Sequence, residues 1–142
     1  MGDTALARLS TIPWCHTLLS SPQWTLTNTA SRVPKASTED SFFAETLHTD
    51  RTIRACLTIR PTEESDGADG AMIFPEVKTI VELGDGLNGF PMIAHGGFVA
   101  TMLDEVMGVL ITSNMSARKK RMGLETDELM GAFTACVYLE VG

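Results

Sequence analysis

The stretch that decides the fold runs from residue 89 to residue 105 and reads GFPMIAHGGFVATMLDE. Two of its glycines, Gly96 and Gly97, lie at the start of the longest apolar segment of the chain, HGGFVATMLDEVMGVLITSN at 95–114. As a helix this segment would be apolar on nearly all sides, which predicts that the helix is buried. The free N–H groups of a first helical turn stabilise developing negative charge, and glycine lets a ligand oxygen approach the backbone.

Two carboxylates, Asp104 and Glu105, follow in the same apolar helix, nine and ten residues after His95. A carboxylate on a buried helix is costly unless it is paired or used, so this pair is a candidate for catalysis. Small residues one turn away leave space beside Asp104: Ala100, Thr101 and Gly108. The structural alternative is a helix flank at which one of the two carboxylates reaches solvent.

Strand patterns lie on both sides of this helix. Four strands are expected: SFFAETLH (41–48), RTIRACLTIR (51–60), EVKTIVEL (76–83) and FTACVYLEV (133–141). The first two, joined by Thr49-Asp50, predict a β-hairpin, and in the second strand Ile53, Ala55, Leu57 and Ile59 alternate with an outer polar face of Arg54, Thr58 and Arg60. A short helix is expected at 12–20, loops at 24–38 and 61–75, and exposed loop or frayed helix at 117–129. These elements predict a single α+β domain over 1–142.

The segment 84–89 reads GDGLNG, which matches the GxGxxG pattern of dinucleotide-binding loops. In such proteins a helix begins at these glycines and its N-terminus binds the pyrophosphate. Here Pro91 follows two residues after the last glycine, and no strand–helix–strand unit surrounds the motif. A loop is therefore expected at 84–89.

The 142 residues carry 11 basic and 18 acidic side chains, a formal net charge of −7. Residues 1–60 hold six basic and five acidic side chains, whereas residues 61–142 hold five and thirteen. A surface for duplex nucleic acid needs the opposite sign, so no nucleic-acid partner is expected. The basic run Arg118–Arg121 fits a phosphate contact or a nuclear address, or else a solvated turn that balances nearby acids.

Cysteines occur at positions 15, 56 and 136 and form no CxxC pair. This pattern argues against a disulfide framework and against a cysteine metal site. The N-terminus lacks the basic and apolar segments of a secretory signal, and no apolar run is expected to approach the ~18 residues of a membrane span. We therefore expect a soluble cytoplasmic enzyme or binding module, with no metal and no membrane partner.

The pattern HGGxxAxxxDE, which follows a GxP loop, resembles the hotdog-fold acyl-CoA thioesterases, in the phenylacetate-pathway branch and its thioesterase-superfamily relatives. IPWC at 12–15, SFF through Leu47 at 41–47, and Thr134-Ala135 also match, so the resemblance covers roughly residues 12–141. It implies a hotdog-like α+β fold, with an antiparallel sheet around a buried central helix. It also implies hydrolysis of an acyl thioester of coenzyme A or of a carrier protein, in settings that include biosynthetic release of polyketide or related acyl products.

The same resemblance implies roles for individual residues. Gly96, with Gly97 beside it, would form the oxyanion hole, and Asp104 would activate water or attack the thioester. Thr134, at the start of the next strand, would orient the water. The expected substrate-binding residues are Asn88, one residue farther from the motif than the family's asparagine, His95, which would fix the turn by hydrogen bonding, and Glu105, the reserve carboxylate. No metal or redox cofactor is implied.

A geometric argument predicts a dimer. Gly96 and Asp104 are eight residues apart, or about 12 Å along one helix. Attack on a thioester needs atoms about 3 Å apart, so one chain cannot supply both groups to one substrate. Two antiparallel copies of the helix around a two-fold axis would bring Gly96 of one chain to Asp104 of the other.

Family members continue after the strand at 133–141 into two further strands, so the resemblance implies that C-terminal strands of the sheet are missing from residues 1–142. That departure leaves a catalytically impaired binding or scaffolding subunit as one alternative. A hotdog dehydratase, whose chemistry would use a histidine in another context, is the second alternative.

Overall fold

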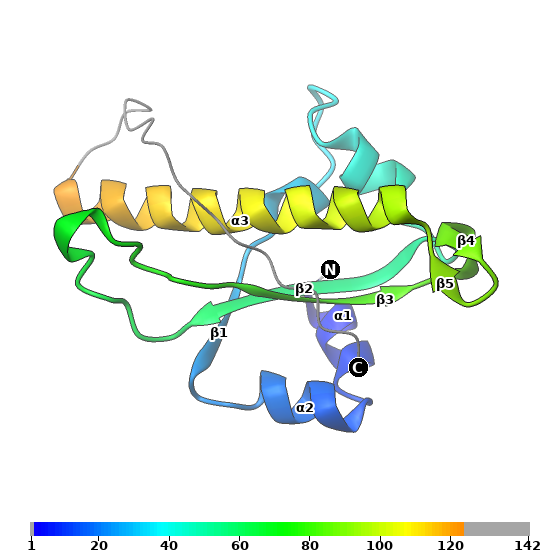
Figure 1. Ribbon diagram of the computed structural model, residues 1–142, viewed down its shortest axis with the longest axis horizontal. Coiled ribbons are helices and arrows are strands. Elements are labelled where there is room, and N and C mark those ends of the chain that lie inside the picture. The colour runs from blue at the N-terminus through cyan, green and yellow to red at the C-terminus, as the bar shows by residue number, and fades with distance from the viewer. Residues whose placement is uncertain (1, 124–142) are drawn as a thin grey trace.

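The computed structural model describes residues 2–123, which form an antiparallel sheet with helices on both faces (Figure 1). The helices are α1 (Gly2–Leu9), α2 (Pro13–Leu19) and α3 (Gly96–Met122), and the strands of the sheet are β1 (Trp24–Thr27), β2 (Ile53–Pro61) and β3 (Lys78–Leu83). A separate hairpin contains β4 (Asn88–Phe90) and β5 (Ile93–Ala94), and four short helical turns are η1 (Ala30–Arg32), η2 (Phe42–Thr46), η3 (Ala68–Gly70) and η4 (Asp85–Leu87). The α+β class with an antiparallel sheet is confirmed. The strand expected at 133–141 lies outside the described residues.

Strand β2 is the centre of the sheet and pairs with β1 on one side and β3 on the other. Ala55 packs with α1 and α2, whereas Cys56 packs on the α3 side. A register shift between Ile53 and Ala55 lets Ile53 join the α3 side too. Thr58 was expected on a polar outer face, but it is only 1% exposed because α3 covers that face, and its hydroxyl bonds to the Thr79 hydroxyl at 2.8 Å.

Helices α1 and α2 cover the face of the sheet opposite α3 (Figure 1). Leu9 and Cys15 are buried there against β2 and β3. Arg8 pairs with Glu82 on β3, and its Nη2 donates to a carboxylate oxygen at 2.7 Å. This contact holds the pKa of the Glu82 carboxyl below its ordinary value. The helix expected at 12–20 is confirmed as α2, and α1 is an additional element.

The hairpin expected at 41–60 is wrong. Residues 42–46 form one turn of π-helix, η2, and the antiparallel partner of β2 is β1, in a segment expected to be loop. Phe43 and Leu47 are buried, and their spacing of four puts both side chains on the α3 side of the sheet. Arg32 secures this turn by donating to the carbonyl oxygens of Phe43 and Leu47, at 2.8 and 3.3 Å.

Helix α3 is longer than expected and ends at Met122, after which Gly123 adopts a φ of 64°. The basic run belongs to its last turns, where an exposed loop or a frayed helix was expected. Arg118 donates to the carbonyl oxygen of Gly70, and Arg121 donates to those of Ser65 and Asp66. These two arginines hold the loop before β3 against the helix, which is a structural use of the basic run.

The helix was expected to be buried all round, and this prediction is wrong for the single chain. Its buried side chains lie along the side that faces the sheet: Phe98, Met102, Val109, Leu110 and Asn114. The opposite side is exposed and consists mainly of small residues, among them Ala100, Gly108, Thr112 and Ser116, with Asp104 in the same row. By length and composition alone α3 could cross a membrane, and 22% of its most apolar window is buried. A helix that keeps an apolar outer side for a partner has the same composition.

Candidate functional site

The N-terminus of α3 is built by His95, Gly96 and Gly97. His95 is the N-cap residue, and its Nδ1 accepts a hydrogen bond from the Gly97 N–H at 2.9 Å. His95 thus holds the turn by hydrogen bonding, as expected for it. The Gly96 N–H is bound by no acceptor within the described residues, and a Cβ at Gly96 would meet no atom within 4 Å. The Gly96 N–H is therefore open, whereas that of Gly97 is already used.

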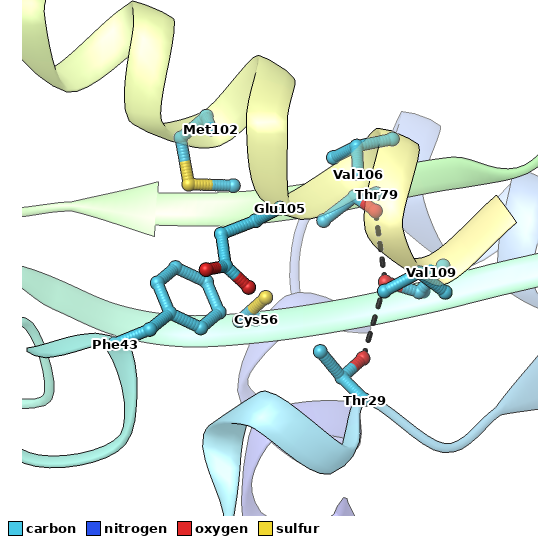
Figure 2. A pocket seen from close by; sticks show the side chains of 9 residues that line it. Thr29, Phe43, Cys56, Thr79, Met102, Glu105, Val106 and Val109 are labelled. Carbon is cyan, nitrogen blue, oxygen red and sulfur yellow. Dashed lines mark hydrogen bonds between the residues drawn. The ribbon is translucent and has the colours of Figure 1, made fainter. Parts of the chain in front are cut away.

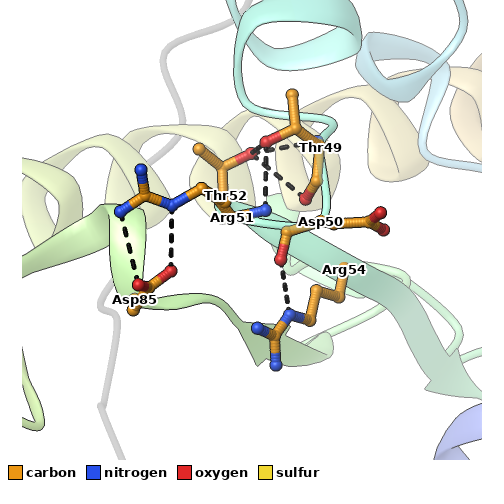
Figure 3. A network of polar contacts seen from close by, with 6 residues as sticks. All are labelled: Thr49, Asp50, Arg51, Thr52, Arg54 and Asp85. Atoms are coloured by element: carbon orange, nitrogen blue, oxygen red, sulfur yellow. Dashed lines mark hydrogen bonds and ion pairs between the residues drawn. The ribbon is translucent and has the colours of Figure 1, made fainter.

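Two glycines of the 84–89 segment, Gly84 and Gly86, pack against the backbone of Arg51. No α-helix begins at them; where a loop was expected, the short 3₁₀ turn η4 and the first residues of β4 follow one another. A Cβ at Gly84 would lie 2.4 Å from the carbonyl carbon of Arg51, and one at Gly86 would lie 2.6 Å from its oxygen. The Arg51 side chain in turn binds Asp85, with N–O distances of 3.2 and 3.3 Å (Figure 3). This pair holds the pKa of the Asp85 carboxyl below its ordinary value.

The expected substrate-binding residue Asn88 lies close to the same turn. It begins β4, is exposed, and pairs in register with Ala94, the residue before His95. The neighbouring Gly89 fits against His95, where a Cβ would be 3.1 Å from the histidine Cα. Asn88 thus lies beside the short segment that leads into α3.

Asp104 lies on the outer side of α3, two turns beyond Gly96. It is exposed, as are its neighbours Ala100 and Gly108, one turn before and one turn after it. In the single chain Asp104 therefore reaches solvent from the flank of the helix, which is the structural alternative given above. Small neighbours leave the carboxylate accessible to another molecule, whereas about 12 Å of helix separates it from Gly96.

Glu105 points to the other side of the helix, toward the sheet (Figure 2). Its carboxylate lies beside the Phe43 ring and the Cys56 thiol. The side chains in this space leave no room for a water molecule between them. Glu105 is partly exposed, and its carboxylate is directed into this tightly packed space, away from the outer side of α3 on which Asp104 lies.

Three threonine hydroxyls line the same space and were not anticipated. Thr29 donates to Thr58 at 3.2 Å, and Thr58 is 2.8 Å from Thr79 (Figure 2). They come from three separate segments, so no spacing in the sequence could have grouped them. The chain of hydroxyls satisfies polar groups between α3 and the sheet, and it is closed to substrate.

Cys56 contributes a thiol to the lining of this space, and this thiol is poorly suited to react. Burial and the charge of Glu105 raise the pKa of its thiol, Arg32 opposes the rise, and the pKa is about 11. The thiolate, not the thiol, is the nucleophile, so Cys56 stays unreactive at neutral pH. Within the described part of the chain, no group of three or more His, Cys, Asp or Glu side chains could hold a metal ion.

The structure thus separates the expected site residues into two sets. Asn88, His95 and the open Gly96 N–H lie together at the start of α3, and Asp104 lies apart from them on the outer side of the helix. The expected residue Thr134 lies outside the described residues. One chain can bind an oxyanion at Gly96 or offer a carboxylate at Asp104, but not both to one small substrate.

Comparison with known proteins gives one partial similarity. No family model matches the chain, and no solved structure matches it. Verlamelin biosynthesis protein B from Lecanicillium sp is 36% identical to it over 70 residues, which are 48% of this chain and 30% of that protein. The chain therefore spans less than a third of the length of this relative, and the similarity concerns about half of its own residues.

Proposed function

We propose that this chain has a hotdog-like fold and hydrolyses an acyl thioester at a site shared by two antiparallel copies of α3. The observation that carries the proposal is the open Gly96 N–H at the start of the helix, with the exposed Asp104 two turns along its outer side. Two-fold symmetry converts the 12 Å separation within one chain into a contact between chains, because antiparallel helices exchange their ends.

The uncovered side of α3 supports this assembly. Ala100, midway between Gly96 and Asp104, is exposed and small, so two helices can approach closely at that level. Gly96 itself has open space around its Cβ position, so a substrate carbonyl can reach its N–H. Asp104 is the one ionisable side chain between Gly96 and Val109 that points outward, since Glu105 is turned toward the sheet.

In the proposed reaction the thioester carbonyl oxygen accepts a hydrogen bond from Gly96 N–H. The partner's Asp104 takes a proton from a water molecule, whose oxygen attacks the carbonyl carbon, or it attacks that carbon itself. The negative charge that develops on the carbonyl oxygen is stabilised by the N–H and by the N-terminal end of α3. The C–S bond then breaks, and the sulfur takes the proton that Asp104 received from water. On the route of direct attack the sulfur takes a proton from solvent, and a water molecule then hydrolyses the acyl anhydride on Asp104, which releases the acid and restores the carboxylate.

The setting that we propose is a biosynthetic pathway in the cytoplasm, in which the enzyme releases an acyl product from coenzyme A or from a carrier protein. The partial similarity to a protein named for the biosynthesis of verlamelin supports this setting. Neither a metal nor a redox cofactor has a part in the proposed chemistry, because the nucleophile is activated by a carboxylate.

The proposal is tested by comparing two isosteric substitutions, Asp104→Asn and Glu105→Gln. Asn has the size of Asp but takes no proton and is a poor nucleophile, so Asp104→Asn should lower kcat for acyl-CoA hydrolysis by at least ~10²-fold and leave binding nearly intact. Glu105→Gln should have a far smaller effect. Full activity of Asp104→Asn, or loss of activity only in Glu105→Gln, would contradict the assignment.

A mixing experiment tests the shared site directly. Asp104→Asn protein retains an intact Gly96, and Gly96→Pro protein retains an intact Asp104, so a hybrid dimer has one complete site. A 1:1 mixture should recover up to about a quarter of the unchanged activity, since half of the dimers are hybrids with one working site each. Acyl-CoA binding without hydrolysis by the unchanged chain would favour the binding or scaffolding subunit. Hydration of enoyl-CoA instead of hydrolysis would favour the dehydratase.

A further inference from the structure

The β4–β5 hairpin carries large apolar side chains that contact little of the chain. Phe90 is 74% exposed, Met92 94% and Ile93 60%. They occupy consecutive positions around Pro91, immediately before the N-terminus of α3. Soluble proteins rarely expose such a group of large apolar residues without a binding partner.

The hairpin is a defined structure and not a loose loop. Asn88 pairs with Ala94 and Phe90 pairs with Ile93, which leaves Pro91-Met92 as a two-residue connection. The His95 N–H donates to the Leu87 carbonyl oxygen at 2.7 Å and closes the base of the hairpin. The exposed side chains are thus held at a fixed position beside the open Gly96 N–H.

Met92 adopts a φ of 64°, a left-handed conformation in which glycine or asparagine is the usual residue. Nothing within residues 2–123 compensates for methionine there, because its side chain is almost fully exposed. A long apolar side chain in a strained turn is explained by a contact outside the single chain.

The dimer of the proposed function determines where this contact lies. In that dimer Gly96 of one helix is level with Asp104 of the other. Ile93 comes three residues before Gly96, so it lies about 5–10 Å from Gly96 along the helix axis, on the side away from α3, whether the rise is that of a helix or of a strand. The same distance beyond Asp104 on the partner's helix corresponds to residues 107–111. Within that stretch Gly108 is exposed and a Cβ on it would meet nothing within 4 Å, so a side chain can enter there.

We propose that the hairpin of each protomer packs across the outer side of the partner's α3, with Met92 against the partner's Gly108. This inference rests on the proposed function for its register, and it adds an apolar wall to the shared site. The acyl chain of a substrate whose carbonyl binds Gly96 then runs between the hairpin and the partner's helix. The partner's stretch 107–112 contains no charged residue, which suits an apolar contact.

The test is cross-linking of a Met92→Cys/Gly108→Cys variant with a short bismaleimide, in a Cys136→Ser background. A covalent dimer is expected, because within one chain Gly108 lies about 18 Å along the helix from Gly96, out of reach of the hairpin. The matched control is Met92→Cys/Ser116→Cys, in which the second cysteine is also exposed but two turns farther along the helix. Equal cross-linking of both variants, or none in the first, would overturn the proposal.

A second variant, Met92→Asn, tests the same contact without a cross-linker. Asn tolerates the left-handed turn, so the far-UV circular dichroism of the folded chain should not change, whereas the dimer dissociation constant from sedimentation should rise at least tenfold. The inference would be overturned if Met92→Asn dimerised as tightly as the unmutated chain, or if the unmutated chain were a monomer. It would also be overturned if only phosphatidylcholine vesicles, and not dimerisation, protected the thiol of Met92→Cys from a maleimide. If hydrolysis fails while Met92→Cys and Gly108→Cys still cross-link, the proposed function falls and the docking stands. If the Gly96 and Asp104 variants complement each other without cross-linking, the reverse holds.

Discussion

Replacing Gly96 by proline removes the one backbone N–H that the proposed oxyanion hole requires. Gly96 is the first residue of α3, where proline is well tolerated because its φ suits a helix and the missing N–H has no helical partner. The preceding His95 has φ −63° and ψ 135°, an extended conformation that a following proline favours. Gly96→Pro should therefore fold normally and lose only the donor.

The size of the effect follows from the hydrogen bonds around the turn. The next N–H, that of Gly97, already donates to His95 at 2.9 Å, so it cannot replace the missing donor without losing the helix cap. Removal of a single oxyanion donor costs about 10²–10³ in kcat, or about 2.7–4 kcal/mol. KM should change little, because the negative charge develops only in the transition state.

The assay is the release of free thiol from acyl-CoA under saturating conditions, with Gly96→Ala as the matched control. Alanine keeps the N–H, and its Cβ meets no atom within 4 Å in the chain, so this variant should retain most of the activity. Equal losses in both variants would indicate crowding instead of a missing donor. A Gly96→Pro enzyme whose kcat stays within about tenfold of the unchanged value would refute the role of this N–H.

Three further predictions follow from the supporting structure. Gly84→Ala should lower the free energy of unfolding in urea by about 2–3 kcal/mol, because its Cβ would lie 2.4 Å from the Arg51 backbone, whereas Gly96→Ala should not. Cys56 has a pKa of about 11, so at pH 7.5 it should react with iodoacetamide only as fast as unfolding exposes its thiol. Peptide mass spectrometry can measure this rate, and rapid labelling would contradict the burial of Cys56. Glu82, whose pKa is lowered by its arginine partner, stabilises the fold above the ordinary glutamate pKa of about 4.3, and this contribution is lost as the pH falls through the lowered value. Glu82→Gln should therefore flatten the acid limb of stability against pH, and an unchanged limb would show that the pair is inert.

The fold was predictable where a local pattern carries the information. The alternation of Ala55 and Leu57 with polar neighbours is sufficient to define β2, and the long apolar run defines α3. The segment at 41–48 was not predictable in this way, because its aromatic residues favour a strand. Its helical turn depends on Arg32, a residue about ten positions earlier, which donates to two of its carbonyl oxygens.

The candidate site shows the same division between local and distant causes. The cap at His95 involves residues two apart, so its geometry follows from the sequence. The exposure of Asp104 does not, because the apolar composition of α3 says that the helix needs cover but not which molecule supplies it. In the single chain the sheet covers one side of the helix. This contact is the reason that Thr58 on β2 is buried, although the sequence predicted that it would be exposed.

The order Asp104-Glu105 links the chemistry to the assembly. Adjacent residues on a helix point about 100° apart, so only one of the two carboxylates can face the sheet. Glu105 is the one that faces the sheet, in tightly packed space beside the Phe43 ring and the Cys56 thiol. The pKa of this thiol is raised by burial. Asp104 is left outward among small neighbours, where a single chain brings it no oxyanion donor. In the mechanism that we propose, this carboxylate acts on a thioester only when a second α3 supplies Gly96, so the proposed catalysis and the proposed dimerisation depend on the same side of the helix.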